Sequence, residues 1–284
     1  MIRANSLAKR LSEEDRQAIR RVAMQFLKEV ESREPPLIPE VVLSARQLSL
    51  FSGDLEEILA NHDLDSGAAN RVDALLQVPE RLIALRRSLT PPQQRWGCIH
   101  ETAHDYLPWH RDLLYFCSIL RLPPEVRGKM ESEADAFAAD AFFFGKRFTE
   151  EVQDFDFGLA GPKELAERRY STSYYATFRR YVEENASSCC LLICQPRYGD
   201  AEFRSPDSLV LKYYVKSPTY RRHIPRGQEV PASSGIWQAF NNVGQITAHE
   251  LVVGPDGKSK RTLRAESFSN SYTVFTLVGE DRDG

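Results

Sequence analysis

Residues 91–110 read Pro-Pro-Gln-Gln-Arg-Trp-Gly-Cys-Ile-His-Glu-Thr-Ala-His-Asp-Tyr-Leu-Pro-Trp-His and contain a complete H-E-x-x-H pentapeptide at positions 100–104. Residues four apart on a helix lie on the same face, so His100 and His104 can bind one zinc ion together. Glu101 then lies beside the ion, where a general base takes a proton from water. A pentapeptide also recurs by chance, so its surroundings must supply a helix and a third ligand.

The flanking residues predict the helix. Thr90 suits the N-cap, Pro91 suits the first turn, and Gln93 completes a capping-box pattern. Pro108 ends the helix shortly after the second histidine. We expect Asp105, near that end, to be a solvated side chain.

Two residues are candidates for the third ligand. His110 stands where the metzincin pattern H-E-x-x-H-x-x-G-x-x-H has its third histidine. That pattern needs glycine at the turn, where the chain leaves the helix sharply. Here the position is Leu107, which Pro108 pushes toward extended geometry.

The other candidate is Glu131, in the strongly helical segment 130–142. Glu131 and Asp135 lie four residues apart on the flank of its apolar stripe, and a carboxylate at the edge of a buried face requires a positive partner. Zinc is that partner in our interpretation, and Asp135 would hold the outer nitrogen of a ligand histidine and fix its tautomer. This spacing favours Glu131 over Glu133, which points to another face.

The two segments together resemble the ImmA/IrrE metallopeptidases. In that family a Pro-x-x-Gln-Arg-aromatic run precedes H-E-x-x-H, and this chain has Gln94, Arg95 and Trp96 there after its two prolines. The family's second helix reads roughly E-x-E-A-N-x-F-A-A, which residues 131–139 match apart from Asp135 in place of asparagine. The chain also has Ala103 where the family usually has glycine.

The resemblance implies a gluzincin-like site with His100, His104 and Glu131 as the zinc ligands and Glu101 as the catalytic residue. It implies zinc as the metal, and we expect one Zn²⁺ per chain; Mn²⁺ is the alternative metal. It further implies a narrow substrate, a Cro/cI-like repressor whose cleavage releases stress or mobile-element genes from silencing.

Three further residues near the motif are candidates for stabilising an oxyanion, a role usually filled by a donor aimed at the developing charge. These candidates are His110, Tyr106 and Tyr115. For each of them, a surface aromatic or a loop histidine is the alternative.

The expected fold class is α+β. Residues 1–150 are expected to form a mostly helical zincin-like peptidase domain, 151–187 a helix-turn-helix-like segment, and 188–284 a mixed α/β domain. The order resembles the IrrE branch, which implies a GAF-like sensor at the C-terminus. The second helix of the middle segment would contact DNA or a partner through Tyr174, Tyr175, Arg179 and Arg180; the alternative is a compact docking element.

Hydrophobic patterning predicts the remaining elements. Helices are expected from Ser12 to a stop at Pro35-Pro36, from Pro39 to Leu50, and from Asp54 to Ala60, whereas 71–89 fits either a helix or a strand. In the C-terminal part we expect a short helix at Gly235–Phe240 and a turn at Gly254–Gly257. The expected strands are Cys189–Cys194, Ser208–Val215, Ile246–Val253, Arg261–Phe268 and Tyr272–Val278.

Bulk composition narrows the class of protein. The net charge of −3 gives no global basic character, so nucleic-acid binding is not favoured and would need a local patch. No apolar run approaches membrane-spanning length and the N-terminus lacks a secretory signal, which predicts a cytoplasmic protein with no membrane partner. Five cysteines without framework spacing indicate reduced thiols.

Two other functions compete with proteolysis. One is a DNA- or ligand-binding transcriptional regulator that keeps the peptidase fold without cleaving anything. The other is a metalloenzyme that acts on a small amide. The intact Glu101 argues against the regulator that does not cleave.

Overall fold

The chain divides into two compact units, each described here by itself. The computed structural model describes residues 11–55, 58, 72–116, 122–198, 206, 208–222, 227–253 and 261–279. The first unit consists of Met1–Phe148 with Arg169–Thr172, and the second of Thr149–Arg168 with Ser173–Gly284. Helices and two sheets make up these units, which confirms the predicted α+β class. None of the described helices is long and apolar enough to cross a bilayer.

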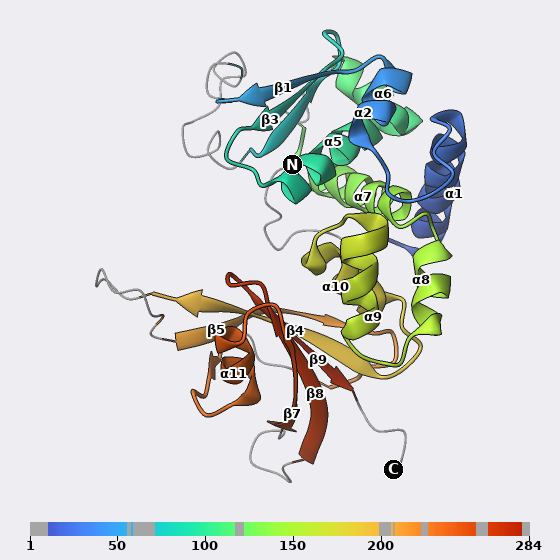
Figure 1. Cartoon of the computed structure of the whole chain (residues 1–284). Coiled ribbons are helices and arrows are strands. Elements are labelled where there is room, and N and C mark those ends of the chain that lie inside the picture. The colour runs from blue at the N-terminus through green and yellow to red at the C-terminus, as the bar shows by residue number, and fades with distance from the viewer. Residues whose placement is uncertain are drawn as a thin grey trace. The chain divides into compact units, whose positions relative to one another are not determined.

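Two long helices form one wall of the first unit. Helix α1 (Glu13–Glu29) begins at Ser12, whose hydroxyl accepts a hydrogen bond from the backbone N–H of Asp15 at 3.0 Å. It packs along α7 (Pro124–Phe142), as Figure 1 shows. The Phe26 and Phe137 rings meet edge to face, with their centroids 5.1 Å apart. Because both rings are fully buried, this contact fixes the helix that carries Glu131.

A three-stranded sheet follows a short helix. Helix α2 (Pro39–Arg46) is shorter than the predicted span to Leu50, because Gln47 adopts a left-handed conformation and ends it. Strand β1 (Ser49–Gly53) begins two residues later. The predicted helix at Asp54–Ala60 lies mostly outside the described residues.

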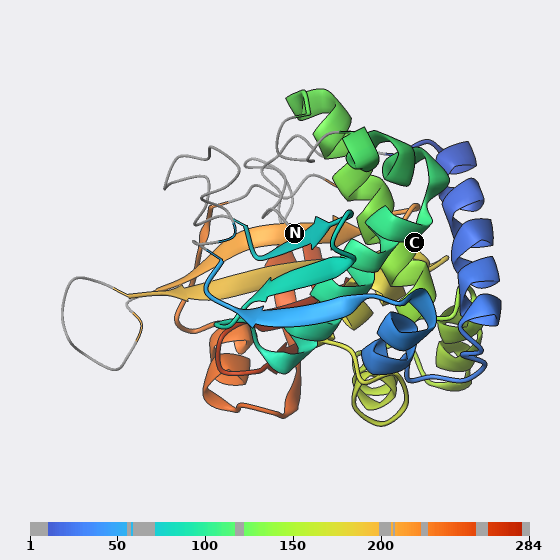
Figure 2. The same cartoon turned by 90° about the horizontal axis from the view of Figure 1, so that it is seen from above.

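The ambiguous segment 71–89 is a hairpin. Strands β2 (Ala74–Gln77) and β3 (Leu82–Arg86) pair antiparallel, and β1 pairs with β3 in parallel. The order is β1-β3-β2, and the strands lie side by side in Figure 2, with β1 in blue. The sheet therefore offers one face for a helix to cover.

The helix that covers it carries the H-E-x-x-H motif. Helix α5 (Pro91–Tyr106) begins as predicted, and Gln93 Oε1 accepts the Thr90 backbone N–H at 2.9 Å. A Cβ added to Gly97 would lie 3.1 Å from the Leu85 side chain, so α5 approaches the sheet closely. On its other side, Trp96 stacks on Phe142 of α7 at 5.6 Å. The motif is thus held between the sheet and α7.

The chain bends directly after α5. Leu107 is extended, with φ −67° and ψ 116°, which is the geometry that the following proline predicts. Helix α6 (Pro108–Phe116) then starts with proline in its first turn. The bend returns the chain toward the motif.

Short helices lead into the second unit. Helix α8 (Arg147–Glu151) is followed by a 3₁₀ turn at Val152–Asp154, then by α9 (Ala160–Leu165), which continues as a π-helical turn at Ala166–Tyr170. Helix α10 (Tyr174–Glu183) starts at Ser173, whose hydroxyl accepts the backbone N–H of Ala176 at 3.2 Å. The predicted succession of helix, turn and helix is present.

The second unit contains a six-stranded antiparallel sheet in the order β6-β5-β4-β9-β8-β7. All five predicted strands are present, and a sixth, β6, is too short to give a sequence pattern. The turn predicted at Gly254–Gly257 lies outside the described residues. The strands are β4 (Cys189–Arg197), β5 (Ser208–Lys216), β6 (Glu229–Val230), β7 (Ile246–Val253), β8 (Arg261–Ser269) and β9 (Val274–Gly279).

Helices cover both faces of this sheet. The predicted short helix is α11 (Gly235–Asn241), which packs on one face through Ile236 and Ala239. Phe178 of α10 meets Phe268 at 5.9 Å and Phe275 at 5.3 Å on the other face. Double coverage explains why the first six residues of β4, Cys189–Cys194, form an unbroken apolar run rather than an alternating one.

Candidate metal centre

Three side chains from two helices converge in the first unit. His100 and His104 lie one turn apart on α5, with ring centroids 5.1 Å apart, and Glu131 faces them from α7. One nitrogen of each histidine and one carboxylate oxygen all lie within 4.8 Å of one another. Both histidines are buried, whereas the Glu131 side chain is 18% exposed. The structure thus brings together the three residues that the sequence proposes as ligands.

His100 is held from its outer side by Asp135. The Nδ1 atom of His100 lies 3.0 Å from Asp135 Oδ1, and its Nε2 atom lies 3.2 Å from Glu131 Oε2. The Nε2 atom is buried, and it makes no contact of hydrogen-bond geometry with the described residues. A cation between this buried nitrogen and the carboxylate would give both groups a partner.

Charge in the cluster is distributed as an ion pair. Burial opposes protonation of His100, but the nearby carboxylates of Asp135 and Glu131 outweigh it and raise the pKa to about 10. Burial also opposes ionisation of Glu131, yet the His100 contact lowers its pKa to about 2. Burial and the nearby His100 lower the pKa of His104 well below the usual value, which keeps that imidazole neutral. His104 and Glu131 are thus already in the forms that bind metal, whereas His100 would release a proton when a metal ion binds.

His104 has a different outer partner, which the sequence analysis missed. Its Nδ1 atom lies 3.0 Å from Nδ1 of His110, and His110 Nε2 lies 2.7 Å from Oε2 of Glu133. Glu133 points away from the ligand group, as predicted. Its side chain is buried, and the carboxylate also accepts a hydrogen bond from Trp109 Nε1 at 2.8 Å. The sequence did offer one indication of this contact. Two side chains with ring N–H groups, Trp109 and His110, follow Pro108, and such donors need an acceptor when they are buried.

The contacts of His110 also bear on its predicted role with an oxyanion. Both of its ring nitrogens are engaged by protein groups, and the side chain is fully buried. It therefore presents no free donor to a substrate. Nor does it belong to the group of ligand atoms, which consists of His100, His104 and Glu131.

The two predicted tyrosines have other surroundings. Tyr106 packs against Phe26 at 5.0 Å, and its pKa is raised to about 12 by burial and by a hydrogen bond to Glu29 of α1. The Tyr106 hydroxyl is thus engaged away from the ligand group. Tyr115 lies in α6, and its side chain falls outside the described residues.

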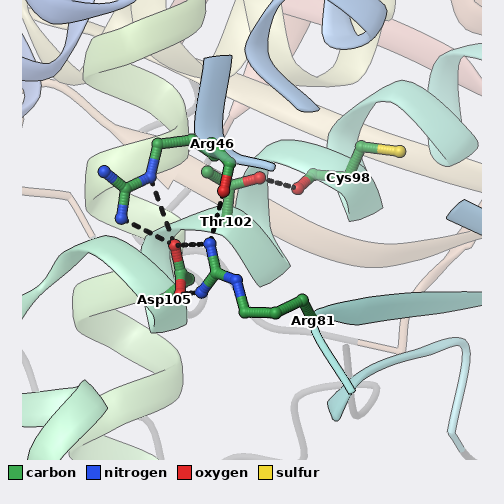
Figure 3. A network of polar contacts seen from close by, with 5 residues as sticks. All are labelled: Arg46, Arg81, Cys98, Thr102 and Asp105. Carbon is green, nitrogen blue, oxygen red and sulfur yellow. Dashed lines mark hydrogen bonds and ion pairs between the residues drawn. The ribbon is translucent and has the colours of Figure 1, made fainter. Parts of the chain in front are cut away.

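Glu101, the predicted base, is buried beside the histidines on α5. Asp105, which follows His104, was expected to be solvated. This prediction is wrong, because the Asp105 side chain is fully buried. It receives Arg46 Nη2 at 2.8 Å and a second arginine, Arg81 (Figure 3). Arg46 ends α2 and Arg81 lies in the β2–β3 turn, so Asp105 ties the ligand-bearing end of α5 to both.

The four residues predicted to contact DNA lie on α10 in the second unit. The Tyr174 hydroxyl donates to Glu167 at 2.6 Å, Arg179 pairs with Glu183 at 3.0 Å, and the buried Arg180 pairs with Glu184 at 2.9 Å. Tyr175 is exposed. Three of the four side chains thus make contacts within the unit. This arrangement fits a compact docking element better than a DNA-recognition helix.

Comparisons with known proteins give a fold. No family model matches the sequence. No curated protein matches it either. Among solved structures, a Mycobacterium tuberculosis transcriptional regulator is similar, with a TM-score of 0.55 at 13% identity over 92% of this chain and 87% of that chain. The chain therefore shares its fold with a transcriptional regulator along most of its length.

Proposed function

We propose that the protein is a zinc-dependent endopeptidase that acts on a regulatory protein. The observation that carries the proposal is the group of His100, His104 and Glu131, with a buried Nε2 atom of His100 that faces a carboxylate. Two imidazoles and one carboxylate are the donor set of catalytic zinc sites, which leave a fourth position open. Two nitrogen donors favour Zn²⁺ over Mn²⁺, which prefers oxygen ligands.

The chain's own residues supply the remaining chemistry. A bound zinc ion would lower the pKa of water in the fourth position and polarise a peptide carbonyl. Glu101 would accept the water proton and return it to the leaving amine. His110 and Tyr106 are engaged elsewhere, so neither is assigned to the oxyanion.

The substrate class rests on the resemblance to ImmA/IrrE peptidases, which implies a Cro/cI-like repressor. The similar solved structure, named a transcriptional regulator, is compatible with a regulatory role and does not bear on the substrate. Cleavage of such a repressor would release the genes that it silences. The C-terminal unit, with its six-stranded sheet covered on both faces, would serve as the sensor that controls cleavage.

The test uses the purified chain with the Cro/cI-like repressor encoded nearest to its gene. We expect cleavage that stops with a chelator and resumes when zinc is added. The Glu101→Gln variant should retain zinc but lose cleavage, because the ligands remain while the base is removed. Cleavage by Glu101→Gln at the parental rate would refute the mechanism.

The second candidate is a transcriptional regulator that does not cleave, favoured by the name of the similar structure. On α10, Tyr175 and Arg179 are exposed, and a DNA phosphate would have to compete with Glu183 for Arg179. A gel-shift assay on the gene's own promoter separates the candidates, with Arg21→Ala on the exposed side of α1 as the control for charge loss. Binding that Tyr175→Ala and Arg179→Ala abolish, without cleavage of any repressor, would support the regulator.

A further inference from the structure

A buried chain of polar contacts runs from the ligand His104 to α7, and it determines which nitrogen of His104 is free. Glu133 Oε2 receives both Trp109 Nε1, which can only donate, and His110 Nε2. An ionised carboxylate only accepts, so the His110 Nε2 atom carries the proton.

The protons of the two histidines follow from this. A neutral imidazole that is protonated on Nε2 has a bare Nδ1, which can only accept. The Nδ1 atom of His110 lies 3.0 Å from Nδ1 of His104, so with a neutral His110 the donor there is His104. Its Nε2 atom is then bare, which is the form that a metal ion requires.

We propose that Glu133 and His110 act as a relay that holds His104 in the tautomer with a free Nε2 and thereby sets the metal affinity of the centre. The tautomer part stands on the contacts alone; the affinity part rests on the proposed metal centre. His110 and Glu133 are positioning residues in this arrangement, since they act through His104. Burial keeps water from substituting for them, because Glu133 is 4% exposed and His110 is 0% exposed.

The tautomers can be read directly in the metal-free protein. Long-range ¹H–¹⁵N correlation spectra of ¹⁵N-histidine-labelled protein distinguish protonated from bare ring nitrogens, and His110→Gln assigns one ring. We expect His104 to be protonated on Nδ1 alone and His110 on Nε2 alone. A His104 ring protonated on Nε2, or a His110 ring protonated on both nitrogens, would overturn the relay.

Metal affinity tests the second part, measured by zinc competition with a chromogenic chelator. His110→Phe keeps the ring volume but no polar atom, and we expect it to weaken zinc binding about 10–100-fold, as loss of an outer partner does. His110→Gln retains one acceptor and one donor, so it should stay within about threefold of the parent. Equal affinities for the Phe and Gln variants would reduce His110 to a packing residue.

A variant at a second position keeps the proposal testable if His110→Phe does not fold. Glu133→Gln retains an acceptor but removes the charge, and we expect zinc binding to weaken about tenfold. Glu125→Gln, the same change at the exposed start of α7, is the matched control and should bind as the parent does. Parental affinity in Glu133→Gln would contradict the relay, whereas parental protein that binds no zinc would refute the proposed centre and leave the tautomers to decide the relay.

Discussion

The Nδ1 atom of His100 lies 3.0 Å from Oδ1 of Asp135, one helical turn beyond Glu131 on α7. The same helix therefore provides both a ligand and the partner that orients another ligand. The ImmA/IrrE peptidases that this chain resembles usually have asparagine at this position. Asparagine offers the same acceptor oxygen without the charge.

We expect Asp135→Asn to keep zinc affinity within about tenfold of the parent, whereas Asp135→Ala should lower it about 10–100-fold. The reason is that Asn Oδ1 can still accept the Nδ1–H of His100 and keep its Nε2 directed at Glu131. Chelator competition measures both affinities. If the two variants bind zinc equally, the hydrogen bond has no part in holding the ligand.

Replacement of Glu131 separates a ligand from an outer partner. Glu131→Gln removes the only carboxylate in the ligand group, so zinc affinity should fall by more than the about 10–100-fold that outer partners cost. Total zinc after gel filtration, compared with Glu133→Gln, gives the ranking. Greater zinc retention by Glu131→Gln than by Glu133→Gln would exchange their roles.

Asp105 predicts a stability effect without a change of ligands. Asp105→Ala leaves two arginines without their buried carboxylate, and we expect a loss of roughly 3 kcal/mol, the low end for a broken buried ion pair because both arginines are partly exposed. Urea unfolding of the chelator-treated protein measures it. Asp112→Ala, an exposed residue on α6, is the control, and an equal midpoint for both variants would contradict the assignment.

The buried thiols of β4 predict an alkaline loss of stability. Burial raises the pKa of Cys190 and Cys194 to about 12 and that of Cys189 to about 11, against 9.0 for an exposed thiol. Below pH 9 the thiols are protonated in both states and their contribution is complete. From pH 9 up to the folded-state pKa, about 11 for Cys189 and about 12 for Cys190 and Cys194, the thiol ionises mainly in the unfolded chain. Over that range each thiol lowers the free energy of unfolding by up to about 1.4 kcal/mol per pH unit.

Urea unfolding at pH 8 and pH 10 tests this contribution. The Cys194→Ala variant should lose less stability over that interval than the parent, because one shifted thiol is absent. Its unfolding at pH 8 provides the baseline for the lost side chain. An identical decrease in both proteins would show that the Cys194 thiol does not titrate with folding.

The sequence predicted those elements whose pattern is local. The capping residues of α5, the bend at Leu107 and the strands of the second unit follow from spacing and proline geometry, which act over a few residues. The end of α2 was missed because a left-handed Gln47 has no sequence signature as strong as glycine. The stretch 71–89 was ambiguous because its apolar residues are buried by α5, which period alone does not reveal.

The three ligand residues could be predicted from the sequence because the spacing within each helix shows which side chains share a face. Of the outer contacts, only that of Asp135 with a ligand histidine was predicted, because Asp135 lies one turn from Glu131 on the same helix. The contacts of His110 with Glu133 and of Arg46 with Asp105 join residues 23 and 59 positions apart, and no local pattern links them. Which of two nearby glutamates meets the histidines depends on the rotation of α7 about its axis. That rotation is set by packing against α1.

Because the chain bends at Leu107, the number of residues between His104 and His110 determines whether their side chains meet. One added residue in α6 before position 110 would turn its side chain by about 100° around the helix and away from His104. A six-residue interval, broken by proline, is therefore as much a property of this centre as the identities of the histidines it separates.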